Sequence, residues 1–329
     1  MKKTIIVCGG AGYIGSHFCK MASKNGFLPV VYDNLSRGHA DAVRWGPLEV
    51  GDICDPLRLD AVFGAYQPDA VVHFAGFAYV GESVSRPDIY YLTNVSGSLT
   101  LFEAMRRHNV RNVLFSSSCA TYGIPNRLPI IESHAQNPIN PYGASKLMVE
   151  RILDDYRLAF GFRPIILRYF NAAGADPEGE IGEVHDPEPH VIPLAIQAAA
   201  GLRKSFNILG ADYDTPDGTC IRDFIHVHDL ARAHCMAIDR LIAGGDPMVV
   251  NLGTGNGHSV REVAEMANLV VGRKADIVLS ARRPGDPPIL VADPSLAREK
   301  LGWSAEIGDL QTIVDHAWNW MKKHNAISS

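Results

Sequence analysis

The stretch Thr4-Ile5-Ile6-Val7-Cys8-Gly9-Gly10-Ala11-Gly12-Tyr13-Ile14-Gly15 decides the fold of this chain. A short β-branched run comes first, then closely spaced glycines, then an amphipathic stretch to Lys24. This order predicts a strand, a tight turn and a helix. Gly9, Gly12 and Gly15 have the spacing G-x-x-G-x-x-G, in which missing side chains let the backbone approach a pyrophosphate at a helix N-terminus. We therefore expect the chain to begin with a dinucleotide-binding unit.

The next apolar run supplies a carboxylate for this unit. Val30 to Tyr32 end in Asp33, 18 residues after Gly15. A carboxylate at this distance binds the adenosine ribose hydroxyls and repels a 2'-phosphate, which favours NAD over NADP. Arg37 is the nearby residue that would suit a 2'-phosphate. We expect the cofactor to be NAD.

Further apolar runs alternate with helical stretches along the first half of the chain. This alternation is typical of α/β proteins with a Rossmann-type, doubly wound parallel sheet. Ligands of such a sheet lie at the carboxyl ends of its strands, where Asp52, Gly76 and Ser118 fall. The expected strands are 48–50, 70–74, 112–116 and 164–167, with a helix at 230–241 and a strand at 248–252.

The second half of the chain predicts a smaller lobe. Residues 174–193 are rich in Gly, Pro and acidic residues and predict loops over a site. We expect an NAD-binding domain at 1–170, to which 222–255 return. Residues 171–221 and 256–329 would form a smaller, interleaved substrate domain.

Tyr142 and Lys146 form a candidate proton-transfer pair. Asn140 and Pro141 read as N-cap and first helical residue, so Tyr142 falls in the first helical turn. Residues four apart share a helix face, so the Lys146 ammonium lies near the phenol and is expected to lower its pKa. Such a pair also arises by chance in many helices. Its position after the strand-end serines, with Ser118 last among them, favours a catalytic role.

Composition and cysteine spacing exclude several classes. The 329 residues carry 31 Lys and Arg against 36 Asp and Glu, a net charge of -5, so we expect no nucleic-acid partner. No apolar run approaches the ~18 residues of a membrane span. The six cysteines are scattered without a C-x-x-C pair, which fits a reducing cytoplasm. His185, His190, His226 and His228 lack the carboxylate-histidine spacing of a known site, and we expect no metal.

The ordered motifs resemble the extended short-chain dehydrogenase/reductase superfamily and, within it, the UDP-glucose 4-epimerase family. The resemblance covers nearly the whole chain. Beyond the glycine turn and the Tyr-Lys pair, the matching motifs are Asp33-Asn34-Leu35, Gly51-Asp52-Ile53, His73-Phe74-Ala75-Gly76, Ser116-Ser117-Ser118, Arg168-Tyr169-Phe170-Asn171, Arg222-Asp223-Phe224-Ile225-His226-Val227 and Arg283-Pro284-Gly285-Asp286.

The resemblance implies a role for each matching residue. Tyr142 would be the base, Lys146 its electrostatic partner and a ribose ligand, and Ser118 the hydroxyl that helps to move the sugar proton. The residues implied to bind NAD are Gly9, Gly12, Tyr13, Ile14, Gly15, Asp33, Asn34, Asp52, Ile53, Phe74, Ala75, Gly76, Asn94, Tyr142, Lys146 and Phe170. Those implied to bind a UDP-sugar are Ser118, Asn171, His190, Val191, Asn207, Leu209, Arg222, Arg283 and Asp286.

The chain departs from the family pattern at three positions. Ala78 stands where a lysine is frequent, and Leu209 where an aromatic residue is common beside the uracil. Leu290 aligns with the position that gates sugar size, and leucine is intermediate there.

The implied activity is interconversion of UDP-galactose and UDP-glucose through transient oxidation at sugar C4, by a cytoplasmic homodimer. A UDP-pentose 4-epimerase, acting on UDP-arabinose or UDP-xylose, would use the same residues. A non-catalytic NAD-binding sensor is the alternative from another class, and the intact Tyr142, Lys146 and Ser118 argue against it. Sugar dehydration is disfavoured because Cys119 and Ala120, rather than a carboxylate, follow Ser118.

Overall fold

The computed structural model describes residues 2–283 and 285–324; Pro284, part of one matching motif, lies outside them. A seven-stranded parallel sheet has the order β11-β6-β5-β4-β1-β2-β3. Its strands are β1 (Thr4–Cys8), β2 (Leu28–Asp33), β3 (Leu48–Val50), β4 (Ala70–His73), β5 (Asn112–Ser118), β6 (Arg163–Tyr169) and β11 (Met248–Leu252). The strand order reverses between β1 and β4, which defines a doubly wound sheet.

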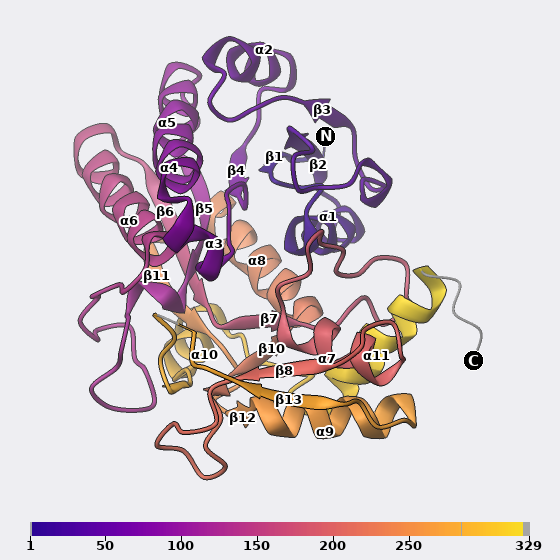
Figure 1. The fold of residues 1–329 in the computed structure, drawn as a ribbon. Helices are drawn as coiled ribbons and strands as arrows, with labels where there is room; N and C mark the ends of the chain where they lie inside the picture. The colour runs from indigo at the N-terminus through magenta and orange to yellow at the C-terminus, as the bar shows by residue number, and fades with distance from the viewer. Residues whose placement is uncertain (1, 284, 325–329) are drawn as a thin grey trace.

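Helices cover both faces of this sheet (Figure 1). Successive strand residues point to opposite faces, and both faces here are apolar, so β1 reads as a continuous hydrophobic run. Ile5 and Val7 share a buried cluster with α1 (Tyr13–Lys24) and α8 (Val227–Ile242). Ile6 and Cys8 share the opposite cluster with residues of α2 (Pro56–Tyr66), α5 (Ser98–Arg107) and α6 (Pro141–Phe160).

Short helical segments lie in the connections between β2 and β3, between β4 and α5, and directly after β5. These segments are η1 (Ala40–Ala42), α3 (Val80–Ser85), α4 (Pro87–Tyr90), the π-helix η2 (Tyr91–Gly97) and η3 (Cys119–Thr121). The π-helical η2 runs directly into α5 and packs against α6, which bears the Tyr-Lys pair.

A smaller lobe packs below the carboxyl ends of the large sheet in the view of Figure 1. Its core joins α7 (Val191–Ala199), α9 (Val260–Val271) and α11 (Leu310–His324). Small sheets complete it: β8 (Phe206–Leu209) with β13 (Ile277–Ser280), β7 (Asn171–Ala173) with β10 (Phe224–His226), and β9 (Ile221–Arg222) between β12 (His258–Ser259) and β14 (Ile289–Leu290).

The predicted fold class is confirmed. One difference concerns the loop expected over 174–193, because α7 already begins at Val191. The domain boundaries stay a prediction. α10 (Ser295–Leu301) lies in the range expected for the smaller domain, yet its Ala297 packs in the core of the large sheet together with Trp303. Within the described residues, no helix combines the length and apolar character needed to cross a membrane.

Candidate active site

A cleft of about 670 Å³ runs from the carboxyl ends of the sheet strands to the smaller lobe. Its walls include residues that directly follow β1, β2, β4, β5 and β6, as expected for a ligand site of a doubly wound sheet. All the residues predicted to bind cofactor or substrate line this cleft except Asp52 and Asn94. Residues from both lobes, between Gly9 and Leu290 in the sequence, thus converge on one cavity.

The backbone of the glycine turn is packed too closely to admit side chains at two of its glycines. Gly9 has φ +80, and a Cβ there would lie 2.5 Å from the backbone nitrogen of Ala75. A Cβ on Gly15 would collide with the carbonyl oxygen of Gly9. Gly12 is the N-cap of α1 and makes no side-chain capping bond, so first-turn N–H groups stay available at the cleft. This backbone fits a pyrophosphate.

Asp33 is fixed at the end of β2 by two backbone N–H groups. Its Oδ2 accepts from Ala11 at 3.0 Å and its Oδ1 from Leu35 at 2.9 Å. Burial raises the pKa of Asp33, and these two hydrogen bonds oppose the rise. The Asp33 carboxylate is therefore held beside the glycine turn, where a group that binds the adenosine ribose is needed.

Arg37, the residue that would suit a 2'-phosphate, is already engaged. Its guanidinium donates to Glu82 Oε1 at 2.7 Å and lies 5.4 and 5.0 Å from the ring centres of Phe77 and Tyr79. A guanidinium paired with a carboxylate and stacked on two rings is poorly placed to receive a phosphate. The geometry thus agrees with a preference for NAD.

Asp52 and Asn94 do not line the cleft, and both are held by hydrogen bonds to neighbouring groups. Asp52 Oδ2 accepts from the side-chain amide of Asn34 at 2.8 Å. Asn94 Oδ1 accepts from the backbone N–H of Phe77 at 2.8 Å, and its amide donates to the Phe77 carbonyl at 3.0 Å and to Ser145 at 3.0 Å. Asn94 therefore holds the loop after β4 against α6. The structure gives it a positioning geometry rather than a place on the cavity surface.

Tyr142 and Lys146 occupy the first turns of α6, as predicted. Asn140 is the N-cap, and its side chain accepts from the Gly143 backbone N–H at 2.9 Å. Lys146 Nζ lies 6.0 Å from the centre of the Tyr142 ring and donates to the Ser116 carbonyl at 2.8 Å. Tyr142, Lys146 and Ser118 are buried, each with only 5 to 8% of its surface exposed, and all three line the cleft.

The predicted lowering of the Tyr142 pKa is wrong for this structure. Burial raises the pKa of the phenol, the nearby Tyr169 adds to the rise, and only the Ser118 hydroxyl, among the leading causes, opposes it. A phenolate loses its hydration in the closed site, and this loss outweighs the attraction that helix spacing alone suggested. Burial also lowers the pKa of Lys146 to about 8, against a rise caused by Glu150.

Arg222 and Arg283, the two arginines expected to bind UDP, differ in how far their N–H groups are already hydrogen-bonded to the protein. Arg222 is buried and directs both terminal nitrogens to the protein, including Asp286 Oδ1 at 2.5 Å and the Pro287 carbonyl at 2.6 Å. Arg283 is 38% exposed and has a 3.7 Å ion pair with Asp286. Its Nε is buried without a hydrogen-bond partner among the described residues. Arg283 is therefore the guanidinium better able to receive a phosphate oxygen.

The remaining substrate positions come from short strands of the smaller lobe. Asn171 begins β7, and its backbone N–H donates to the Asp223 carbonyl at 2.9 Å. Asn207 and Leu209 lie in β8, where both are exposed to the cleft side. Leu290 ends β14 and is buried beside Cys119 and Phe170. Because Cys119 has a pKa raised mainly by burial, its thiol is a packing group.

A model of the NAD dependent epimerase/dehydratase family matches residues 5–253. The chain belongs to this family. The UDP-glucose 4-epimerase of Rhizobium meliloti (strain 1021) is 52% identical over 321 residues, which are 98% of each chain.

Solved structures of relatives agree with this family membership. The UDP-glucose 4-epimerase of Brucella ovis in complex with NAD has a TM-score of 0.93 and 55% identity over 96% of this chain and 97% of that one. The UDP-glucose 4-epimerase of Bifidobacterium longum in complex with NAD+ and UDP has a TM-score of 0.94 and 37% identity over 98% and 99%. The resemblance inferred from the motifs is confirmed, and NAD is the cofactor of the family.

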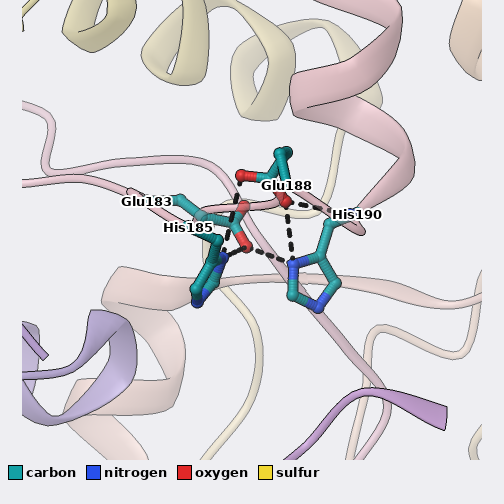
Figure 2. A group of neighbouring side chains, drawn as sticks. All are labelled: Glu183, His185, Glu188 and His190. Carbon is teal, nitrogen blue, oxygen red and sulfur yellow. Dashed lines mark hydrogen bonds and ion pairs between the residues drawn. The ribbon is translucent and has the colours of Figure 1, made fainter. Parts of the chain in front are cut away.

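This member of the epimerase/dehydratase family has a side-chain cluster that sequence reasoning missed. Figure 2 shows that the Nδ1 edges of His185 and His190 face the carboxylates of Glu183 and Glu188. His190 Nδ1 lies 2.5 Å from Glu183 Oε1 and 3.2 Å from Glu188 Oε1. Burial lowers the pKa of both imidazoles, but the carboxylates outweigh it and raise them. The spacing E-x-H-x-x-E-x-H was the available signal.

Other cleft residues of this family member also escaped sequence reasoning. They lie in segments without a recognisable motif, and only the folded chain brings them to the cavity. These residues include Tyr79, Glu82, Thr93, Phe206 and Cys220.

Proposed function

We propose that this protein is a UDP-glucose 4-epimerase, which interconverts UDP-galactose and UDP-glucose by transient oxidation at C4 of the sugar. One observation carries the proposal. A single cleft joins the glycine turn and Asp33 at one end, Tyr142 with Lys146 and Ser118 in the middle, and Arg283 at the other. The curated relatives named for this activity, which match over nearly their whole length, support it.

The fit to NAD rests on the chain's own residues. The free first-turn N–H groups of α1 would hold the pyrophosphate, Asp33 the adenosine ribose, and Lys146 the other ribose. Bound NAD supplies a hydride acceptor that becomes a hydride donor, so a secondary alcohol can be oxidised and reduced again on its other face.

Tyr142 and Ser118 would handle the hydroxyl proton of C4. We infer that Tyr142 accepts this proton as a phenolate, directly or through the Ser118 hydroxyl, and returns it after the sugar has turned. Burial disfavours the phenolate, and the hydrogen bond from the Ser118 hydroxyl opposes this effect. The Lys146 Nζ lies 6.0 Å from the centre of the Tyr142 ring. A closed site also keeps the proton from water, so it remains available for the return step.

The UDP group would be held far from the reacting carbon. Arg283 has an Nε–H without a hydrogen-bond partner among the described residues, which is a donor for the diphosphate, while Arg222 and Asp286 set the shape of this wall. Binding energy collected at UDP leaves the sugar free to present either face. Asn171, His190, Val191, Asn207 and Leu209 complete the proposed substrate site.

A UDP-pentose would meet the same groups, so the test compares both sugars. Purified protein is mixed with UDP-galactose or with UDP-arabinose, without added NAD, and the products are resolved. We expect UDP-glucose to form faster than UDP-xylose. Inversion of neither sugar would refute the epimerase proposal, and binding of NAD without turnover would identify a sensor.

We further infer a cytoplasmic homodimer that acts in galactose metabolism. All six cysteines are free and five of them are buried, which suits a reducing compartment. Large apolar side chains are exposed on neighbouring η2, α5 and α6, among them Leu92, Leu99 and Met148. Exposed apolar groups that gather on adjacent helices are typical of an interface. Light scattering should give twice the chain mass, and Leu92→Glu should give the monomer.

A further inference from the structure

The cluster of Glu183, His185, Glu188 and His190 lies in a long segment without regular structure. Between β7 and α7, residues 174–190 form neither helix nor strand. Loops of this length are uncommon in compact domains unless they bind something or are anchored. Glu183, His185 and His190 nevertheless line the cleft, so the segment must be held in one arrangement.

Hydrogen bonds satisfy the ligand atoms of this cluster only in part. Glu188 Oε1 accepts from the backbone N–H of His190 at 2.9 Å and lies 3.2 Å from His190 Nδ1. One potential ligand atom from each of the four residues lies within 4.8 Å of all the others. Glu183 Oε1 and His185 Nδ1 are buried and have no hydrogen-bond partner among the described residues, although they lie 3.2 Å apart. The side chains of Glu183 and Glu188 are only 6 and 7% exposed. A buried carboxylate oxygen of Glu183 and a buried imidazole nitrogen of His185 therefore lie in a shielded centre without a hydrogen-bond partner among the described residues.

The distances suit a metal ion at this centre. Zinc bonds to nitrogen and oxygen of about 2.0–2.2 Å place tetrahedral ligand atoms roughly 3.3 Å apart. The nitrogen–oxygen separations from His185 are 3.2 Å to Glu183 and 3.7 Å to Glu188, and His190 is 3.2 Å from Glu188. The His190–Glu183 separation, 2.5 Å, is shorter, as in a direct ion pair.

A second group of acids in the same segment is paired with an ammonium instead of imidazoles. Asp176, Glu178 and Glu180 all surround Lys20, whose Nζ lies 2.5 to 2.8 Å from each of them. No lysine or arginine forms an ion pair with Glu183 or Glu188 in the described part of the chain. The two clusters therefore differ in kind, because the first has imidazole nitrogens where the second has an ammonium.

We propose that Glu183, His185, Glu188 and His190 bind a divalent transition-metal ion of the zinc class. Imidazole and carboxylate together favour such an ion over magnesium, which prefers oxygen ligands. The ion fixes the segment before α7 against the lobe that contains the large sheet. There the centre of the His185 ring lies 5.5 Å from that of Tyr79 and 6.5 Å from that of Tyr13. The ion thereby orders the cleft wall that carries His190 and Val191.

Metal content and stability test the site in the full-length, NAD-loaded protein. The wild type, His185→Gln, Glu188→Gln and the control His258→Gln are treated with chelator, titrated with Zn²⁺, washed free of excess and measured by mass spectrometry. His258 is a suitable control because a single carboxylate, Glu262, lies 3.7 Å from it. The wild type and the control should retain about one Zn²⁺ per chain, and each cluster variant less than about 0.2.

Thermal unfolding gives an independent measurement of zinc binding. It also shows whether a variant loses zinc because the variant itself is less stable. Zn²⁺ should raise the melting temperature of the chelated wild type by a few degrees, roughly as expected for a ligand bound only by the native state, and Mg²⁺ should not. Zinc retained equally by both cluster variants would place the metal elsewhere, for example on cysteines. No retention by the wild type, or no shift in its melting temperature, would overturn the proposal.

Discussion

Lys146 Nζ lies 6.0 Å from the centre of the Tyr142 ring and donates its hydrogen bond to the Ser116 carbonyl, at 2.8 Å. The ammonium is thus tied to strand β5 on one side and faces the phenol on the other. Burial makes both the ammonium and the phenolate costly. The charged forms of both side chains are therefore destabilised at the place where the proposed reaction needs them. Changes to either residue should affect both activity and stability.

Tyr142→Phe should lower kcat at least ~10²-fold, the scale of a positioned acid–base group, because the phenol oxygen is lost. Turnover of UDP-galactose and the melting temperature should be measured together. Tyr66→Phe is a matched control, since Tyr66 hydrogen-bonds to Glu49 at 2.7 Å and does not line the cleft. Near-normal turnover by Tyr142→Phe would remove Tyr142 from the proposed role.

Lys146→Met should stabilise the cofactor-free protein at pH 7. Burial lowers the pKa of Lys146 from 10.5 to about 8, so folding disfavours the ammonium. The cost is complete below pH 8 and disappears as the pH rises towards 10.5; its size is roughly 3 kcal/mol, less the hydrogen bond that is lost. Urea unfolding at pH 7 and pH 10 measures the gain in the free energy of unfolding. A gain that does not shrink at the higher pH contradicts this explanation.

Asp33→Asn combined with Glu82→Gln should shift cofactor preference towards NADP. The first change removes the charge that repels a 2'-phosphate, and the second releases Arg37 from its ion pair. Loss of a charged hydrogen bond to the ribose should weaken NADH binding by roughly 10- to 100-fold. Fluorescence titration with NADH and NADPH gives the ratio of the dissociation constants. An unchanged ratio would mean that another group selects the cofactor.

Arg283→Gln and Arg222→Gln should separate binding from stability. Arg283 has free donors, so its loss should raise the Kd of UDP by roughly 10- to 100-fold with little change in melting temperature. Arg222 is the 9% exposed partner of Asp286, and its removal leaves this carboxylate with the longer, 3.7 Å ion pair to Arg283, so the variant should unfold at a lower temperature. Calorimetric titration with UDP and thermal unfolding measure both effects. The reverse pattern would exchange their roles.

Local patterns explain which parts of the fold the sequence predicted. The bounds expected for β1, β3 and β11 agree with the structure, because a short apolar run bounded by turn residues limits a strand on its own. The N-cap at Asn140 is equally local. By contrast, α7 begins inside the predicted loop, where Pro193 suggested a break although proline is tolerated in a first helical turn.

The site was less predictable where its properties depend on burial or distant partners. The raised pKa of Tyr142 requires knowledge of the closed cavity, and the saturation of Arg222 requires the loop around Asp286 to fold back on it. The four cluster residues lie within eight positions, yet their meeting depends on the path of an irregular segment. Motif spacing identifies which groups are present, and packing decides what they can do.

The fate of the hydrogen on C4 tests the central proposal most directly. UDP-galactose carrying deuterium at C4 is converted in ordinary water, and the product is examined by mass spectrometry and NMR. Oxidation and reduction at one carbon inside a closed site predict UDP-glucose that keeps the deuterium at C4. UDP-glucose in which solvent hydrogen has replaced the label would contradict the account.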